Sequence, residues 1–149
     1  MLNINDKMKK VILDGSNLNL EKRYLAFLNE IISKTKRVGD CVIYDGEGIS
    51  ESDINWEKVF KYVGDFTGYE VGCNEFRLEK SECDVSQCQK LAQDMHDMLQ
   101  DKYKEKQFVV YVYINDGNID MRFHTYRIAD GFWLKEDLNG YDNPVLWLM

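Results

Sequence analysis

One group of side chains near the carboxyl end could do acid–base or anion-binding chemistry. Arg122, His124 and Tyr126 recur at every second position. Because side chains of a β-strand alternate between its two faces, this spacing predicts that all three lie on one polar strand face. They would form a cationic, hydrogen-bonding strip that could hold a carboxylate or another anion. The structural alternative is that they pair with Asp or Glu side chains of a neighbouring element.

His124 is also the side chain that best suits a general base. Such a base needs a nucleophile within hydrogen-bond reach, and no nearby serine or cysteine lies in a motif such as G-x-S-x-G. A small hydrolase or ligand-binding enzyme centred on His124 is therefore an alternative function. The second histidine, His96, is expected at the boundary of a helix's apolar stripe, which favours a structural role.

A second group is a run of carboxylates between residues 40 and 57, a stretch that contains no Lys or Arg. Its candidate contact residues are Asp45, Glu47, Glu51, Asp53 and Glu57. The run lacks the spacing of a calcium-binding loop, and its acids would repel a phosphate from the G-x-G that they flank. It indicates either a solvated loop that leads into a helix or a docking surface for a basic partner.

Length and charge exclude several classes of protein. The 149 residues suit one domain, residues 1–149, and the net charge is −7. The first 37 residues carry +4 and the remaining 112 carry −11, whereas a nucleic-acid surface needs a positive field. No apolar run approaches the roughly 20 residues that cross a membrane, and no secretory leader is recognisable. We therefore expect a cytoplasmic protein that binds neither nucleic acid nor membrane.

The cysteines and the acids give no sign of a metal or of another cofactor. Cys41, Cys73, Cys83 and Cys88 include no C-x-x-C pair, and their spacing with His96 fits no common zinc pattern. In the expected reducing compartment, all four should be free thiols.

Three main helices are expected from apolar residues at intervals of three and four. The first runs over about 20–37 behind a cap at Asn19, and Gly39 ends it. The second runs from a cap at Ser52 to about Phe66, with Trp56, Val59, Phe60 and Val63 facing inward. The third runs from a cap at Asp84 to about Tyr103, with the stripe Val85, Cys88, Leu91, Ala92, Met95, Met98 and Leu99.

Strands are expected at Cys41–Tyr44 and, from alternation, over 69–78. The clearest local signal is the β-branched and aromatic run 108–114, followed by an N-D-G-N turn and the alternating segment 119–126. This pattern predicts an antiparallel hairpin. The apolar tail over 131–149 should dock on the core as a further strand. The fold class is therefore α+β: three main helices with a mostly antiparallel sheet that contains a C-terminal hairpin.

The second half of the chain resembles small bacterial immunity proteins of polymorphic toxin systems, including contact-dependent growth inhibition. The motifs that carry the resemblance are R-F-H-T-Y-R at 122–127, G-F-W-L at 131–134, D-L-N-x-Y-D-N-P at 137–144 and G-Y-E-V-G-C-N-E-F-R-L at 68–78. The resemblance implies a cytoplasmic, cofactor-free protein that binds the C-terminal toxin domain of a cognate effector, often a nuclease. It would block the toxin's active site or an essential exosite.

The acidic character of the chain agrees with that implication, because nuclease toxins carry basic substrate grooves. We therefore predict a non-enzymatic immunity protein whose contact surface is the acidic segment from Asp45 to Glu57. The strip of Arg122, His124 and Tyr126 is the second candidate surface. An intracellular adaptor without a toxin partner is a further alternative.

Overall fold

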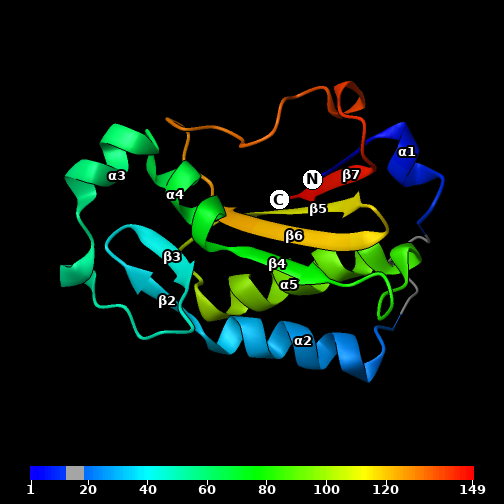
Figure 1. Cartoon of the computed structure of the whole chain (residues 1–149), viewed down its shortest axis with the longest axis horizontal. Helices are drawn as coiled ribbons and strands as arrows, with labels where there is room; N and C mark the ends of the chain where they lie inside the picture. Colours follow the sequence, from blue (N-terminus) through cyan, green and yellow to red (C-terminus); the bar gives the residue numbers. More distant parts are fainter. Residues whose placement is uncertain (13–18) are drawn as a thin grey trace.

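A five-stranded antiparallel sheet forms the middle of the fold (Figure 1). The computed structural model describes residues 1–12 and 19–149. The strand order is β1-β7-β5-β6-β4, and β2 and β3 form a separate two-stranded sheet. The strands are β1 (Leu2–Ile4), β2 (Thr35–Val38), β3 (Cys41–Tyr44), β4 (Glu75–Leu78), β5 (Phe108–Asn115), β6 (Asn118–Thr125) and β7 (Val145–Leu148).

The predicted hairpin is confirmed as β5 and β6, which pair from Phe108↔Thr125 to Asn115↔Asn118. Its two-residue turn has positive φ at both central positions, 51° at Asp116 and 82° at Gly117. That backbone matches the right-handed twist of the flanking strands, and Asp-Gly is among the sequences that adopt it most readily. The apolar tail also docks as predicted, since β7 pairs with β5 on one side and with β1 on the other.

The α+β class is confirmed, but the number of helices is not three. The described residues form five α-helices, of which four have seven residues or more. They are α1 (Asp6–Lys9), α2 (Lys22–Ser33), α3 (Trp56–Tyr62), α4 (Phe66–Cys73) and α5 (Cys88–Lys102). The third predicted helix is α5, preceded by a short 3₁₀ turn that the Asp84 side chain caps. Most of its predicted stripe is fully buried.

The first predicted helix is too long at its carboxyl end, because α2 stops at Ser33 and Thr35–Val38 is strand β2. Thr35 and Val38 are buried where β2 pairs with β3, so the energy of that pairing outweighs the helical pattern. The predicted cap at Asn19 is wrong as well. The N-cap position is Glu21, which makes no side-chain capping bond.

The second predicted helix is only partly formed, because its predicted cap, Ser52, lies in a 3₁₀ turn over Glu51–Asp53 and α3 covers only Trp56–Tyr62. Asn55 caps α3 and Asp65 caps α4, each accepting a backbone N–H three residues on. Gly64, with a φ of 101°, makes the turn between them. The predicted strand over 69–78 is wrong over its first half, which is the second part of α4, and β4 begins only at Glu75.

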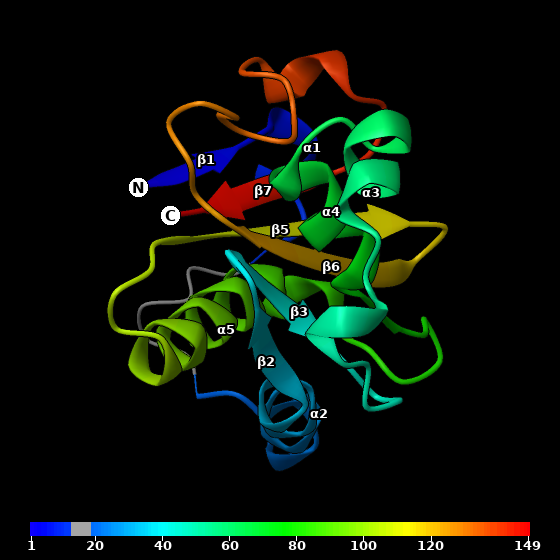
Figure 2. The same cartoon turned by 90° about the vertical axis from the view of Figure 1, so that its left-hand side faces the viewer.

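The main sheet is covered on both faces (Figure 2). Helices α2 and α5 cover one face, and the largest apolar cluster, which includes Leu28, Leu91 and Phe123, fills the space between them and the sheet. The chain after β6 crosses the opposite face, where Tyr111 and Trp147 belong to a second cluster. A third cluster joins the β2–β3 hairpin to α3 and α4. This last cluster supports the segment that carries most of the candidate contact residues.

Truncating the α5 stripe should weaken the main core. Leu91→Ala, at a fully buried position, should lower the free energy of unfolding by about 2–5 kcal/mol through lost burial and a residual cavity. Urea denaturation followed by circular dichroism measures this. Asp101→Ala on the exposed face of the same helix is the control and should shift stability by about 0.5 kcal/mol or less. Equal effects of the two changes would refute the assignment of the buried face.

Candidate functional site

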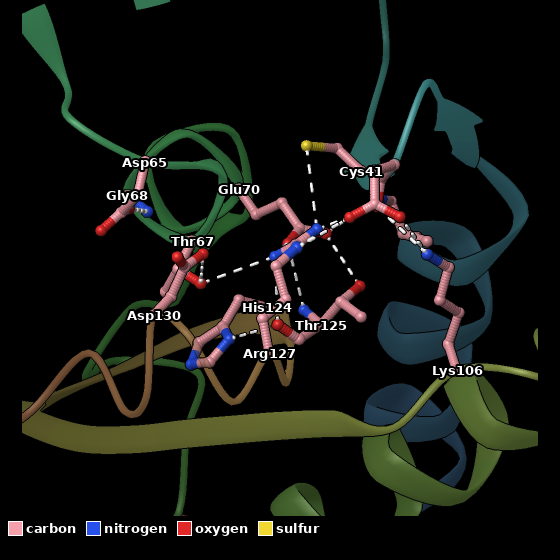
Figure 3. Close-up of polar contacts among 12 residues, drawn as sticks. Cys41, Asp65, Thr67, Gly68, Glu70, Lys106, His124, Thr125, Arg127 and Asp130 are labelled. Carbon is pink, nitrogen blue, oxygen red and sulfur yellow. Dashed lines mark hydrogen bonds and ion pairs between the residues drawn. The ribbon is translucent and has the colours of Figure 1, made fainter. Parts of the chain in front are cut away.

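A buried carboxylate, that of Glu70, joins α4 to both sheets (Figure 3). The side chain is fully buried. Its Oε2 accepts the backbone N–H of Val42 in β3 at 2.8 Å and the hydroxyl of Thr125 in β6 at 3.0 Å. Its Oε1 accepts the backbone N–H of Thr125 at 3.2 Å and a hydrogen bond from Arg127. One side chain therefore ties together a helix, a strand of the small sheet and a strand of the large sheet.

Arg127 extends this network to the turn between β2 and β3. Its Nε donates to the Asp40 carboxylate at 3.0 Å, and its Nη2 donates to the Asp40 carbonyl at 2.9 Å. Lys106 binds the other oxygen of the same carboxylate at 3.0 Å. The hydrogen bonds from Arg127 and Lys106 hold the pKa of Asp40 below its ordinary value. The β2–β3 turn is thus fastened to the end of β6 and to the start of β5.

Asn74 makes a second, neutral connection between the same elements. The buried side chain donates from Nδ2 to the carbonyls of Val42 at 2.9 Å and Phe123 at 3.2 Å, and its Oδ1 accepts the N–H of Tyr44 at 2.7 Å. Each of its two N–H groups and its carbonyl oxygen therefore has a partner, as a buried amide requires.

The polar network has the properties of a structural clamp. Burial raises the pKa of Glu70, while the bonds from Arg127, Val42 and Thr125 oppose that rise. Both carboxylate oxygens are occupied by protein donors, and the side chain is closed to solvent. Sequence analysis missed Glu70 and Arg127, because 57 residues separate them and Glu70 was assigned to a strand. The Asp65 capping signal, read as the start of a new helix, would have placed Glu70 correctly.

His124 does not belong to an exposed cationic strip, and that expectation is wrong. The side chain is fully buried. Its Nδ1 lies 2.8 Å from the carbonyl of Thr125 and its Nε2 lies 2.9 Å from the hydroxyl of Tyr111. Because a carbonyl only accepts, Nδ1 carries the hydrogen and Nε2 accepts from Tyr111. Burial lowers the pKa of His124 to about 4, so the ring is neutral at pH 7.

Arg122 and Tyr126, the other two members of the predicted strip, have different partners. Arg122 binds Glu75 at 2.9 Å, which is the carboxylate pairing that the structural alternative anticipated. The ring of Tyr126 packs against Phe132, with centroids 5.3 Å apart. The three side chains therefore do not form one anion-binding strip, and His124 is not placed to act as a general base toward a solvent-borne substrate.

Asp45 is distinct from the rest of the acidic run. Its side chain is only 3% exposed, pairs with Lys36 and accepts the N–H groups of Glu47 and Gly48. The hydrogen bond from Lys36 is the main cause that lowers its pKa. Lys36 also donates to the carbonyl of Ile49. Asp45 therefore shapes the loop rather than offering a free charge on its surface.

The other four candidate contact residues of the run are exposed. Glu47, Glu51, Asp53 and Glu57 form no ion pair with any residue in the part of the chain that the structure describes. The Asp53 side chain accepts the N–H of Ser50 in a capping box and is exposed all the same. These four predicted contact residues thus lie exposed on one segment, residues 45–63, which also carries the exposed Lys58 and Lys61 and which we call the acidic lobe.

The acidic lobe also exposes apolar side chains, and two of them, Phe60 and Val63, belong to the stripe that was predicted to face inward. Phe60, Tyr62 and Val63 are 45%, 75% and 47% exposed. Helix α3, which carries the first two, lies at the margin of the molecule, away from the main sheet (Figure 1). Trp56 of the predicted inward stripe has two aromatic contacts, with ring centroids 5.6 Å from Phe66 and 5.4 Å from Tyr69, and Phe60 has one, 4.9 Å from Phe66. The short helix explains the difference, because α3 has too few residues to bury a full stripe.

The described residues contain no group of three or more His, Cys, Asp or Glu side chains that could hold a metal ion. The four cysteines are free thiols, and burial raises the pKa of Cys41 to about 12. Among the described residues, no helix has both the length and the apolarity that crossing a membrane requires.

A family model described as the Uncharacterized protein PM0498 family matches residues 3–148. The match leaves out only the first two residues and the last one. The chain belongs to this family. Neither a curated protein nor a solved structure matches the chain. The family match includes the acidic lobe, the polar network and all seven strands except the first residue of β1.

The neutral state of His124 should make stability depend on pH. The folded pKa of about 4 lies below the ordinary value of 6.5, so between these values only the unfolded state binds the proton. His124 therefore contributes stability above pH 6.5 that is lost as pH falls toward 4, by about 3 kcal/mol in total. Urea denaturation at intervals across this range measures the loss. His124→Gln should flatten the slope, and an unchanged slope would contradict the assignment.

The Glu70–Arg127 pair should show strong coupling. Arg127→Met leaves the buried carboxylate without its cation and should cost about 3–5 kcal/mol of stability. Adding Glu70→Gln should recover part of this loss, because the uncompensated charge is gone. A double-mutant cycle in urea measures the coupling. Arg37→Met is the control, since Arg37 and its partner Glu105 are half exposed and their pair should be worth about 1 kcal/mol or less. Additive effects at Glu70 and Arg127 would refute the clamp.

Proposed function

We propose that the protein is a non-enzymatic binding protein of the immunity type, which neutralises a cognate toxin domain by docking on it with the acidic lobe. The observation that supports this proposal is the combination, on residues 45–63, of four exposed carboxylates that form no ion pair with a described residue and four exposed apolar side chains, namely those of Ile49, Phe60, Tyr62 and Val63. If the segment served only to keep the protein soluble, exposed apolar side chains would bring no advantage. A surface that only needed packing would not require the charges.

The charges of the lobe indicate the kind of partner. Glu47, Glu51, Asp53 and Glu57 would attract a basic surface over about a Debye length and would raise the rate of encounter. A nuclease toxin has such a surface, since its substrate groove must attract phosphates. The net charge of −7 acts in the same direction. In this proposal the lobe covers the basic groove.

The exposed aromatics would supply most of the affinity. Aromatic side chains are enriched among the few interface residues that dominate binding energy. Phe60 and Tyr62 lie on α3, and the edge-to-face contact between Phe60 and Phe66, at 4.9 Å, holds the first ring against α4. A partner would therefore meet an anchored ring with little side-chain entropy left to lose.

The identity of the partner follows from the resemblance to immunity proteins in the second half of the chain. It implies the C-terminal domain of a polymorphic toxin, bound in the cytoplasm of the producing cell without a cofactor, nucleic acid or membrane. An adaptor without a toxin partner would use the same lobe and differs from this proposal only in its partner. The hydrolase centred on His124 gains no support from a buried, neutral ring whose nitrogens are both engaged.

Co-expression tests the toxin partner directly. An immunity gene lies directly after its toxin gene, so the test uses the C-terminal domain encoded by the gene immediately upstream. That domain should kill the expressing cell, and this protein should restore growth and co-purify with the domain at a fixed ratio. Growth that stays inhibited, with no complex formed at low salt, would overturn the proposal.

Charge variants test the docking surface in the same complex. Replacing Glu47, Glu51 and Glu57 by Gln and Asp53 by Asn should slow association about tenfold at low salt and weaken its salt dependence. The matched control replaces four exposed acids outside the lobe, namely Glu79, Glu82, Asp101 and Glu136, and removes the same net charge. Stopped-flow association measures both variants. Equal slowing by the two sets would mean that total charge, and not the lobe, drives binding.

A further inference from the structure

A hollow of about 280 Å³ opens on the face of the main sheet opposite α2 and α5. It lies between the end of β5 and the chain that follows β6. Three aromatic side chains, Tyr113, Trp133 and Tyr141, line it together with the amides of Asn115 and Asn143. The size is close to the lower end of the range for ligand pockets, roughly 300–1,000 Å³. It therefore suits a single ring better than an extended cofactor.

The aromatic walls are held in place before anything binds. Arg122 donates from Nε to the Tyr113 hydroxyl at 3.2 Å, and its guanidinium carbon lies 5.1 Å from the centre of the Trp133 ring. The backbone N–H of Trp133 donates to the hydroxyl of Tyr111 at 2.9 Å. The hydroxyl of Tyr141 accepts the N–H of Lys135 at 2.9 Å. Preformed walls reduce the entropy lost when a ligand enters.

Several polar groups of the lining keep a hydrogen-bond donor or acceptor that no described residue uses. The hydroxyls of Tyr113 and Tyr141 accept bonds there but donate none. Asn143 uses its Nδ2 on the carbonyl of Ile114 at 2.8 Å, which leaves Oδ1 without a donor. An occupant with both a donor and an acceptor could satisfy these groups.

The charge of the lining restricts further the kinds of chemical group that the hollow could bind. Every side chain of the lining is neutral. Arg122, which supports the walls, binds Glu75 at 2.9 Å and the carbonyl of Val71 at 2.8 Å. A charged occupant, whether a carboxylate or an ammonium, would lose hydration without meeting an opposite charge in the lining. Aromatic walls with polar groups therefore favour a neutral aromatic ring that carries a hydroxyl.

We propose that this hollow is an anchor pocket for a tyrosine side chain of the protein partner. The proposal rests on the proposed function, since it adds a second contact to the same partner. Arg122 links the two contacts, because its guanidinium supports the walls of the hollow and binds the carbonyl of Val71 in α4, the helix against which Phe60 of the acidic lobe packs. The charged lobe would govern the rate of encounter, and the pocket would govern the lifetime of the complex.

Titration with N-acetyl-L-tyrosinamide, followed by NMR, tests the pocket without the partner. The compound should shift the indole N–H signal of Trp133 and the side-chain amide signals of Asn115 and Asn143, with a dissociation constant on the order of 1 mM. N-acetyl-L-phenylalaninamide should bind about two- to tenfold more weakly, because it lacks the hydroxyl. The lysine analogue should cause no shift. Absence of saturable shifts, or equal binding of the three compounds, would overturn the proposal.

Two variants separate this pocket from the acidic lobe. Tyr141→Phe removes one hydroxyl of the lining and should reduce the preference for tyrosinamide over phenylalaninamide. The control, Phe60→Ala in the lobe, should leave both titrations unchanged. A preference that survives Tyr141→Phe, or that disappears in Phe60→Ala, would contradict the assigned site. Because no partner is present, failure here leaves the growth-protection test of the lobe untouched.

Discussion

The rest of the structure depends on one constraint: a carboxylate that is fully closed to solvent must find partners within the protein. Glu70 meets this demand with two backbone N–H groups, a hydroxyl and a guanidinium. These partners belong to β3, to the end of β6 and to Arg127 just beyond it, so satisfying one charge fixes two strands relative to α4. Arg127 then brings Asp40 into the network and with it the turn of the small sheet. The acidic lobe is therefore attached to a rigid base.

The same type of side chain thus serves two purposes in this protein, according to its burial. Glu70 is enclosed and holds elements together, whereas Glu51 and Glu57 are exposed and, in the proposed function, attract a partner. Asp45 lies between these extremes, because Lys36 and two backbone N–H groups use its charge to shape the loop. This division gives the proposed function a physical basis. The lobe can expose charged and apolar side chains and keep its conformation, because the hydrogen-bond network of Glu70 and Arg127 stabilises the elements next to it.

Local patterns were sufficient to predict the β5–β6 hairpin and most of α5, because an Asp-Gly turn and a long apolar stripe each determine their element over adjacent residues. Local patterns failed where a contact between residues far apart in the sequence determines the structure. Thr35–Val38 is a strand because β3 is there to pair with it. The clamp joins Glu70 and Arg127, which are 57 residues apart, and no residue spacing in the sequence predicts that contact. His124 was assigned to the correct strand, but its burial depends on the chain that returns over that face.

Hydrogen exchange of the complex, read by mass spectrometry, tests the central claim most directly. The protein would be compared alone and bound to the proposed toxin domain. We expect slower exchange over the acidic lobe, residues 45–63. We expect no change over α5, which covers the face of the main sheet that lies away from the chain after β6. Protection confined to α2 and α5, with the lobe exchanging as in the free protein, would contradict the claim that the lobe is the docking surface.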